Sequence, residues 1–201
     1  MLDHVNPVLI RDAVPGDARV LAELMAIAGA GIPQWLWSAH AAPGEAPIDV
    51  GTRRAMREEG GFSWRNAIVA EREGAVVGMI LGYPLEADET DLAEIDPLLR
   101  PFIVLERLVP GSWYINAFAV FAPWRSTGIG ARLIDAAKDR TRALGLARMS
   151  VQYFSENPRA GAFYARHGFV ETASKTLPDN DICTYRGDTV LMVAQIPARG
   201  G

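Results

Sequence analysis

Three residues at one predicted strand-to-helix junction have the types and spacing needed to hold a phosphate group. The segment FAVFAPWRSTGIGARLIDAA passes from an apolar stretch through Arg125, Gly128 and Gly130 into an amphipathic stretch. The N-terminus of a helix carries N–H groups without partners and a partial positive charge. Glycines let the backbone approach a ligand and adopt positive φ, and Arg125 adds a permanent cation. This junction therefore predicts a pyrophosphate-binding loop.

Two other phosphate motifs do not fit this junction. A dinucleotide-binding turn needs a third glycine, where this chain has Leu133, and a Walker A loop needs lysine directly after the second glycine, where it has Ala131. One plain alternative stays open at this point, namely that Gly128 and Gly130 only permit a tight turn between strand and helix.

Apolar periodicity and turn residues predict the elements that position this loop. Strands are expected at 7–14, 112–121, 147–154, 168–177 and 188–196, and as a hairpin over 66–85 that turns near Glu73-Gly74. Helices are expected at 18–31, capped by Asp17, and at 52–59, 128–144 and 158–167, whereas 31–51 shows no clean period. The alternation in the second half favours an α/β (α+β) fold with a mixed sheet, interrupted by an insertion at 86–110 that carries a short helix.

Composition narrows the classes of protein and partner. A chain of 201 residues favours a single domain, 1–201, and its formal net charge of −4 argues against nucleic acid as the main partner. The sequence has no apolar run long enough for a membrane helix and no evident signal peptide. The lone Cys183 has no disulfide partner in the chain, and no Cys/His spacing indicates a metal site, so we expect a cytoplasmic protein without metal.

Two segments together resemble the GNAT superfamily of N-acyltransferases. AVFAPWRSTGIGARLI is similar to its acyl-CoA-binding motif, Gln/Arg-x-x-Gly-x-Gly/Ala after an apolar strand. SENPRAGAFYARHGFVE, further along the chain, resembles the next motif, in which an Asn precedes a helix that bears a Tyr and ends in Gly-Phe. One departure is Ser126, where many members have Gly. The resemblance implies a mostly antiparallel central sheet flanked by helices, with acetyl-CoA as the acyl donor.

The resemblance also implies where acetyl-CoA binds. The pantetheine arm is expected along the backbone of Phe118, Ala119 and Val120, two of whose side chains could equally be ordinary core. The pyrophosphate is expected at Arg125, Ser126, Thr127, Gly128, Ile129, Gly130 and Ala131.

The second motif implies three more site residues on one helix. Asn157 is a good N-cap for a helix that starts at Pro158, and the family pattern adds a bond from Asn157 to the cofactor arm. Phe163 is expected beside the cofactor, and Tyr164 is expected to protonate the departing thiolate, since a phenol with a pKa near ~10 keeps its proton at neutral pH. For Tyr164 a purely structural place in the core remains the alternative, and His167 is read as a helix-end residue.

The general base is missing from the expected place. Some family members carry a Glu early in the central strand, but residues 112–116 contain no carboxylate. Asn116 is a candidate for orienting the acceptor or a water. The proton acceptor is hypothesised to be a water relay or a carboxylate of the insertion, such as Glu94 or Asp96.

The acceptor and the oligomeric state are less defined. The expected reaction is direct attack of a small-molecule or peptide amine on acetyl-CoA. The alternatives are a catalytically silent acyl-CoA sensor or partner-binding module, and a nucleotide-phosphate-binding protein unrelated to coenzyme A. Dimers are common among similar proteins, so a homodimer is compatible with the sequence. Two groups of side chains could bind the acceptor. The first is a set of acids that could attract a cationic amine or could form only a solvated loop: Glu86, Asp88, Glu89, Asp91, Glu94 and Asp96. The second is a set of aromatics that could line an acceptor pocket or could be ordinary core: Trp35, Trp37, Phe62 and Trp64.

Overall fold

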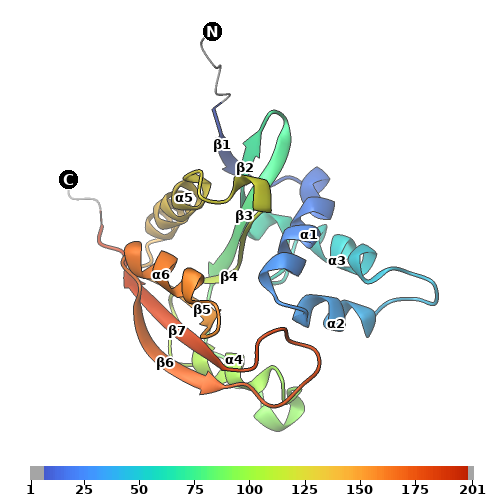
Figure 1. Cartoon of the computed structure of the whole chain (residues 1–201). Coiled ribbons are helices and arrows are strands. Elements are labelled where there is room, and N and C mark those ends of the chain that lie inside the picture. The colour runs from blue at the N-terminus through green and yellow to red at the C-terminus, as the bar shows by residue number, and fades with distance from the viewer. Residues whose placement is uncertain (1–6, 199–201) are drawn as a thin grey trace. The chain divides into compact units, whose positions relative to one another are not determined.

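The computed structural model describes residues 7–198 as a mixed, mostly antiparallel sheet flanked by helices, which confirms the predicted fold class (Figure 1). The strands are β1 (Leu9–Asp12), β2 (Ala67–Arg72), β3 (Ala75–Pro84), β4 (Trp113–Val120), β5 (Arg148–Phe154), β6 (Val170–Thr176) and β7 (Asp188–Gln195). The helices are α1 (Ala18–Ala28), α2 (Ile32–Ser38), α3 (Pro47–Ala55), α4 (Arg100–Glu106), α5 (Ile129–Ala143) and α6 (Pro158–Arg166). The strand order is β1-β2-β3-β4-β5-β7-β6, with β4 and β5 parallel.

The chain forms two compact units, which share the strands β3 and β4 and the helix α5. The first unit contains residues 7–81 and 117–137. Its β1, β2 and β3 pair antiparallel, and the predicted hairpin turn is present, with positive φ at Glu73 and Gly74. The helix α1 buries Leu21 and Leu24 completely, whereas Ile27 near its end is exposed.

The second unit contains residues 82–116 and 138–198. Its strands β5, β7 and β6 form an antiparallel ribbon, in which β6 is drawn orange and β7 red in Figure 1. The helix α4, the predicted short helix of the insertion, packs on this ribbon through Leu105, whose side chain lies in one apolar cluster with Val109 and Leu191. The insertion is therefore tied to the sheet by buried apolar contacts.

Two helices occupy the segment without a clean period. In α2 and α3 a proline, Pro33 or Pro47, stands in the first turn, where the missing N–H costs nothing. The side chain of Trp37 on α2 is buried and stacks on Phe62, with ring centroids 5.9 Å apart. The predicted helix over 52–59 is wrong in its bounds, because α3 begins earlier and ends at Ala55.

Asp17 stands at the N-cap position of α1, but its side chain does not make the predicted capping hydrogen bond. Its carboxylate instead accepts hydrogen bonds from the guanidinium of Arg11 at 2.7 Å and from the backbone N–H of Val14 at 2.9 Å. Arg11 also pairs with Glu71 on β2 at 2.7 Å, so Asp17 links the start of α1 to the sheet. Leu144, the last residue of the helix predicted over 128–144, lies just beyond α5 and is half exposed.

Among residues 7–198, no helix is both long and apolar enough to cross a bilayer. The same residues contain no group of three or more His, Cys, Asp or Glu side chains placed to hold a metal ion.

Candidate active site

The predicted phosphate loop lies in the first unit and leads from β4 into α5. Two of its residues have positive φ, Ser126 at 65° and Gly128 at 85°. A Cβ added to Gly128 would meet no heavy atom within 4 Å, so the loop is open there. Successive backbone N–H groups around left-handed residues at a helix N-terminus form a concavity that binds anions. The residues present therefore fit a pyrophosphate, and Gly128 has the backbone conformation that the sequence predicted.

Arg125 fastens the start of this loop to the end of β4. Its Nε–H donates to the carbonyl oxygen of Val120 at 2.9 Å, and the hydroxyl of Thr127 donates to the carbonyl oxygen of Trp124 at 2.7 Å. Arg125 is exposed and forms no ion pair within the described part of the chain. Its positive charge is thus positioned beside the helix N-terminus and available to an anion.

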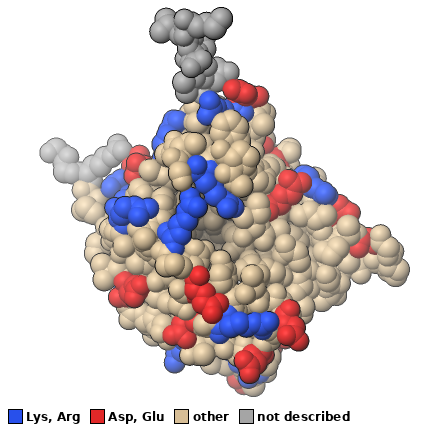
Figure 2. Space-filling view, in the orientation of Figure 1, with Lys and Arg blue, Asp and Glu red and all other residues tan. Residues whose placement is uncertain are grey.

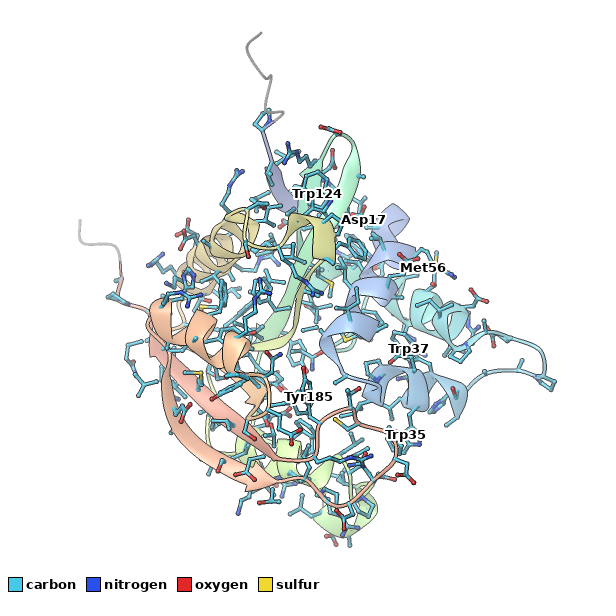
Figure 3. All side chains as sticks on the ribbon, viewed as in Figure 1. Asp17, Trp35, Trp37, Met56, Trp124 and Tyr185 are labelled. Carbon is cyan, nitrogen blue, oxygen red and sulfur yellow. The ribbon has the colours of Figure 1, made fainter. Side chains whose placement is uncertain are left out.

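Trp124, labelled in Figure 3, also anchors the start of the loop. The guanidinium carbon of Arg72, at the end of β2, lies 4.6 Å from the centroid of the Trp124 ring. A cation above an indole face is an attractive contact of about 0.5–2 kcal/mol, depending on its exposure. The β2–β3 hairpin therefore helps to fix the start of the phosphate loop.

The ladder between β4 and β5 is short. It pairs Trp113–Ile115 with Met149–Val151, although β4 continues to Val120 and β5 to Phe154. An early end to this ladder is compatible with the predicted role of residues 118–120 in binding the pantetheine arm, which stays a prediction. The side chain of Ala119 is buried, and those of Phe118 and Val120 are half-buried.

In the second unit, Asn157 is the N-cap of α6, as predicted. Its side-chain oxygen accepts the backbone N–H of Ala160 at 3.2 Å, and Pro158 is the first helical residue. At the other end His167 is the C-cap and Gly168 has a φ of 89°, which confirms His167 as a helix-end residue. The cap accounts for Asn157 locally, and its bond to a cofactor arm remains a prediction.

Tyr164 is a core residue whose proton is firmly held. Its side chain is only 6% exposed, and its ring lies 5.6 Å from that of Phe163 and 5.5 Å from that of Phe169. Burial raises the pKa of Tyr164, so the phenol stays protonated at any neutral pH. This is the protonation state that a general acid needs. Phe163 itself is half-buried and also contacts the ring of His167.

The two carboxylates hypothesised as bases are solvent-exposed. Glu94 lies in a short 3-10 turn, and the carboxylate of Asp96 accepts the backbone N–H of Leu98 at 2.8 Å. Asn116 is exposed on β4.

A different carboxylate of the insertion is partly buried. Glu106, the last residue of α4, hydrogen-bonds to the hydroxyl of Tyr114 on β4. The pKa of Glu106 is raised to about 7, because burial and the charge of Asp88 raise it more than the hydrogen bond from Tyr114 lowers it. Sequence reasoning missed Glu106, whose signal is a single acid inside the apolar run FIVLERLV.

The charged surface is mixed. Figure 2 shows Lys and Arg side chains alongside Asp and Glu side chains on the displayed face. The six acids at the start of the insertion are all exposed, as expected of a solvated loop, and Asp88 pairs with Arg107 at 2.9 Å. Of the four aromatics considered for an acceptor pocket, Trp37 is buried in the core of the first unit.

A family model described as the acetyltransferase (GNAT) family matches residues 32–169. The chain belongs to the GNAT family. It is therefore an acyltransferase, of a family whose acetyl donor is acetyl-CoA. The family match begins well before the first of the two motifs and includes the helices α2 and α3.

Several solved structures have the same fold. A protein described as an acetyltransferase has a TM-score of 0.66 and 20% identity over 94% of this chain and 100% of its own. An N-acetyltransferase from Staphylococcus aureus Mu50 has a TM-score of 0.62 and 16% identity, over 92% of this chain and 100% of its own. The ribosomal-protein-S18-alanine N-acetyltransferase from Escherichia coli has a TM-score of 0.59 and 15% identity, over 97% of both chains. These identities establish the fold alone. No curated protein matches the chain.

Proposed function

We propose that this GNAT protein transfers the acetyl group of acetyl-CoA to an amine of a small-molecule or peptide acceptor, by direct attack of the amine on the thioester. The observation that carries the proposal is the loop at the start of α5. Positive φ at Ser126 and Gly128 and the fixed guanidinium of Arg125 make it a cationic, donor-rich site of the kind that binds a pyrophosphate.

The proposed contacts with acetyl-CoA can be tested one residue at a time. In the first unit, the backbone of Phe118, Ala119 and Val120 is proposed to pair with the pantetheine arm, and residues 125–131 with the pyrophosphate. In the second, Asn157 and Phe163 are proposed to contact the arm.

Catalysis is proposed to depend mainly on positioning, with one proton donor. Holding an amine against the thioester converts a bimolecular step into an intramolecular one, and general acid catalysis contributes roughly 10²–10⁴-fold. Tyr164 would give its proton to the sulfur as the carbon–sulfur bond breaks, which its raised pKa supports. Asn116, exposed on β4, would orient the acceptor or a water.

The test combines binding with turnover. Calorimetric titration with acetyl-CoA is expected to show binding by the wild-type protein and none by Gly128→Glu, because a carboxylate would stand in the anion site. Thiol release from acetyl-CoA, measured with a panel of amines, is then expected to depend on at least one amine. Wild-type protein that is folded by circular dichroism but does not bind acetyl-CoA would contradict the proposal.

The same assays distinguish the proposed enzyme from a rival function. A catalytically silent sensor would bind acetyl-CoA and lose binding in Gly128→Glu, yet release no thiol with any amine. Tyr164 favours the enzyme, since a sensor has no need of a buried phenol on this helix.

A further inference from the structure

The second unit contains a connected group of polar side chains around Glu106. We call Tyr83, Glu106, Tyr114 and Gln152 the Glu106 cluster. The hydroxyl of Tyr114 hydrogen-bonds to Glu106, and Nε2 of Gln152 donates to the Tyr114 hydroxyl at 3.4 Å. The ring of Tyr83 meets that of Tyr114 edge-on, with centroids 6.0 Å apart. The cluster thus joins the end of α4 to β3, β4 and β5.

Backbone and side-chain contacts hold Gln152 in place. Its Nε2 also donates to the carbonyl oxygen of Phe102 on α4 at 3.0 Å, and its Oε1 accepts the hydroxyl of Thr189 on β7 at 3.0 Å. The ring of Phe102 contacts Phe154, which stacks on Tyr185, labelled in Figure 3, with centroids 4.8 Å apart. The polar groups therefore lie among aromatic side chains, and Gln152 fixes the orientation of Tyr114.

Glu106 is the group of this cluster that titrates near neutral pH. Burial raises the pKa of Tyr114 and of Tyr83, so both phenols keep their protons. The negative charge of Asp88, which itself pairs with Arg107, also raises the pKa of Glu106. A carboxylate whose pKa is about 7 is a better proton acceptor at neutral pH than an exposed one, because base strength rises with pKa.

We propose that Glu106 accepts the proton that the acceptor amine must lose, and that Tyr114 and Gln152 hold its carboxylate in position. This inference rests on the proposed acetyl transfer. It replaces Glu94 and Asp96 by a third carboxylate of the same insertion. The place along the chain is suitable, since Tyr114 precedes by a few residues, on the same strand, the stretch 118–120 proposed to bind the donor arm.

The proton balance is complete with two groups of this chain. An ammonium acceptor gives its first proton to Glu106, and the lone pair released forms the bond between nitrogen and the acetyl carbon. As the carbon–sulfur bond breaks, its electron pair goes to sulfur, which takes a proton from Tyr164. Tyr164 regains a proton from the second N–H that the nitrogen loses, and Glu106 returns its proton to solvent. The products are the acetylated amine and free coenzyme A thiol.

The main experiment compares the pH dependence of kcat in the wild-type protein, Glu106→Gln and Glu59→Gln. The acceptor should be an active amine that itself ionises far from pH 7. We expect the wild-type kcat to rise with pH through about 7, and Glu106→Gln to lose that rise and about 100-fold or more of kcat at pH 8, with binding of acetyl-CoA unchanged. Glu59, an exposed acid in the first unit, is the matched control and should behave as wild type.

Two further variants leave Glu106 in place and shift its titration in opposite directions. Tyr114→Phe removes a hydrogen bond that favours the charged carboxylate, so the rise in kcat should move to higher pH. Asp88→Asn removes a negative charge, so the rise should move to lower pH. A purely structural role for Glu106 gives no such pair of opposite shifts, and this arm stands even if Glu106→Gln does not fold.

The outcomes distinguish this inference from the function on which it rests. If wild-type protein turns over but Glu106→Gln keeps its pH profile and its kcat within about threefold, or if the profiles of Tyr114→Phe and Asp88→Asn coincide with the wild type, Glu106 is not the base and acetyl transfer stands. If wild-type protein binds acetyl-CoA but releases no thiol with any amine, the proposed function itself is overturned, and the assignment of Glu106 with it.

Discussion

Arg125 donates its Nε–H to the carbonyl oxygen of Val120 at 2.9 Å, and thereby joins the start of the phosphate loop to the last residue of β4. An arginine presents several donors in one planar group, so it can make this bond and still direct other N–H groups to an anion. The contact therefore sets the position of the positive charge rather than neutralising it.

Replacing Arg125 should weaken the binding of acetyl-CoA without unfolding the protein. Hydrogen bonds to charged groups contribute about 1.5–3 kcal/mol, so Arg125→Ala is expected to raise the Kd of acetyl-CoA by roughly tenfold or more, and Arg125→Lys by less. Calorimetric titration at two salt concentrations measures this, with Arg57→Ala, on the exposed segment after α3, as the control. A Kd of Arg125→Ala that equals the wild-type value would contradict the role of this residue.

Gly128→Ala should destabilise the protein by about 1 kcal/mol, and the cause is conformational. The added methyl group meets no atom within 4 Å, but φ at Gly128 is 85°, a value that residues with a Cβ rarely adopt. Gly16 is a matched control because it is equally uncrowded and its φ is not positive, so Gly16→Ala should be neutral or slightly stabilising. Thermal unfolding of both variants compares the two. Equal changes in Tm would show that backbone conformation at Gly128 costs nothing.

The parts of the site that could be predicted from sequence are those determined locally. The conformation of Gly128 follows from a turn of a few residues, and the cap at Asn157 needs only a backbone N–H three positions later. The helix α2 was not predicted and the start of α3 was placed too late, because 31–51 shows no clean apolar period, although Pro33 and Pro47 each stand in the first turn of a helix.

The rest depends on contacts that are distant in sequence. The pKa of Glu106 is set mainly by burial and by its hydrogen bond with Tyr114 on β4. No sequence pattern within α4 shows that Tyr114 lies against Glu106. The same holds for Asp17, a good local cap that is instead held by Arg11 and Val14. A sequence motif can indicate which carboxylates exist, but only the packed sheet decides which one is buried.

The ionisation of Glu106 should cost stability as pH rises. In the unfolded chain its carboxyl loses its proton near the ordinary value of 4.5, whereas in the folded protein it keeps the proton up to about 7. Between these values the folded state binds more protons, so the free energy of unfolding falls with increasing pH. Glu106→Gln removes this dependence, so its stability relative to wild type should rise by about 3 kcal/mol between pH 4.5 and pH 8. Thermal unfolding of both proteins from pH 4.5 to 8 tests the sign, and parallel curves would show that Glu106 titrates normally.

Asn157 allows its structural role to be separated from its proposed contact with the cofactor. Asn157→Ala removes the N-cap of α6 and should cost about 1 kcal/mol, whereas Asn157→Asp keeps an oxygen for the N–H of Ala160 and should change stability little. Asn157→Asp replaces the amide donor by a negative charge, so a weaker Kd for acetyl-CoA in that variant would indicate a contact with the cofactor. Urea unfolding and calorimetric titration provide the two measurements. An unchanged Kd in Asn157→Asp would leave capping as the whole role of this residue.

Tyr164→Phe should lower kcat by about 100-fold while leaving acetyl-CoA binding unchanged, because it removes the proposed proton donor and keeps the ring. The contacts of that ring with Phe163 and Phe169 are retained, so the variant should remain folded. Tyr153→Phe is the matched control, since it removes a hydroxyl that hydrogen-bonds to Glu171 at 2.6 Å on the surface of the same unit. The pKa of Tyr164 is raised, so wild-type kcat should show no loss from its deprotonation at mildly alkaline pH. If Tyr164→Phe and Tyr153→Phe both keep kcat within about twofold of wild type, the thiolate leaves without help from this phenol, and Tyr164 is a core residue of α6.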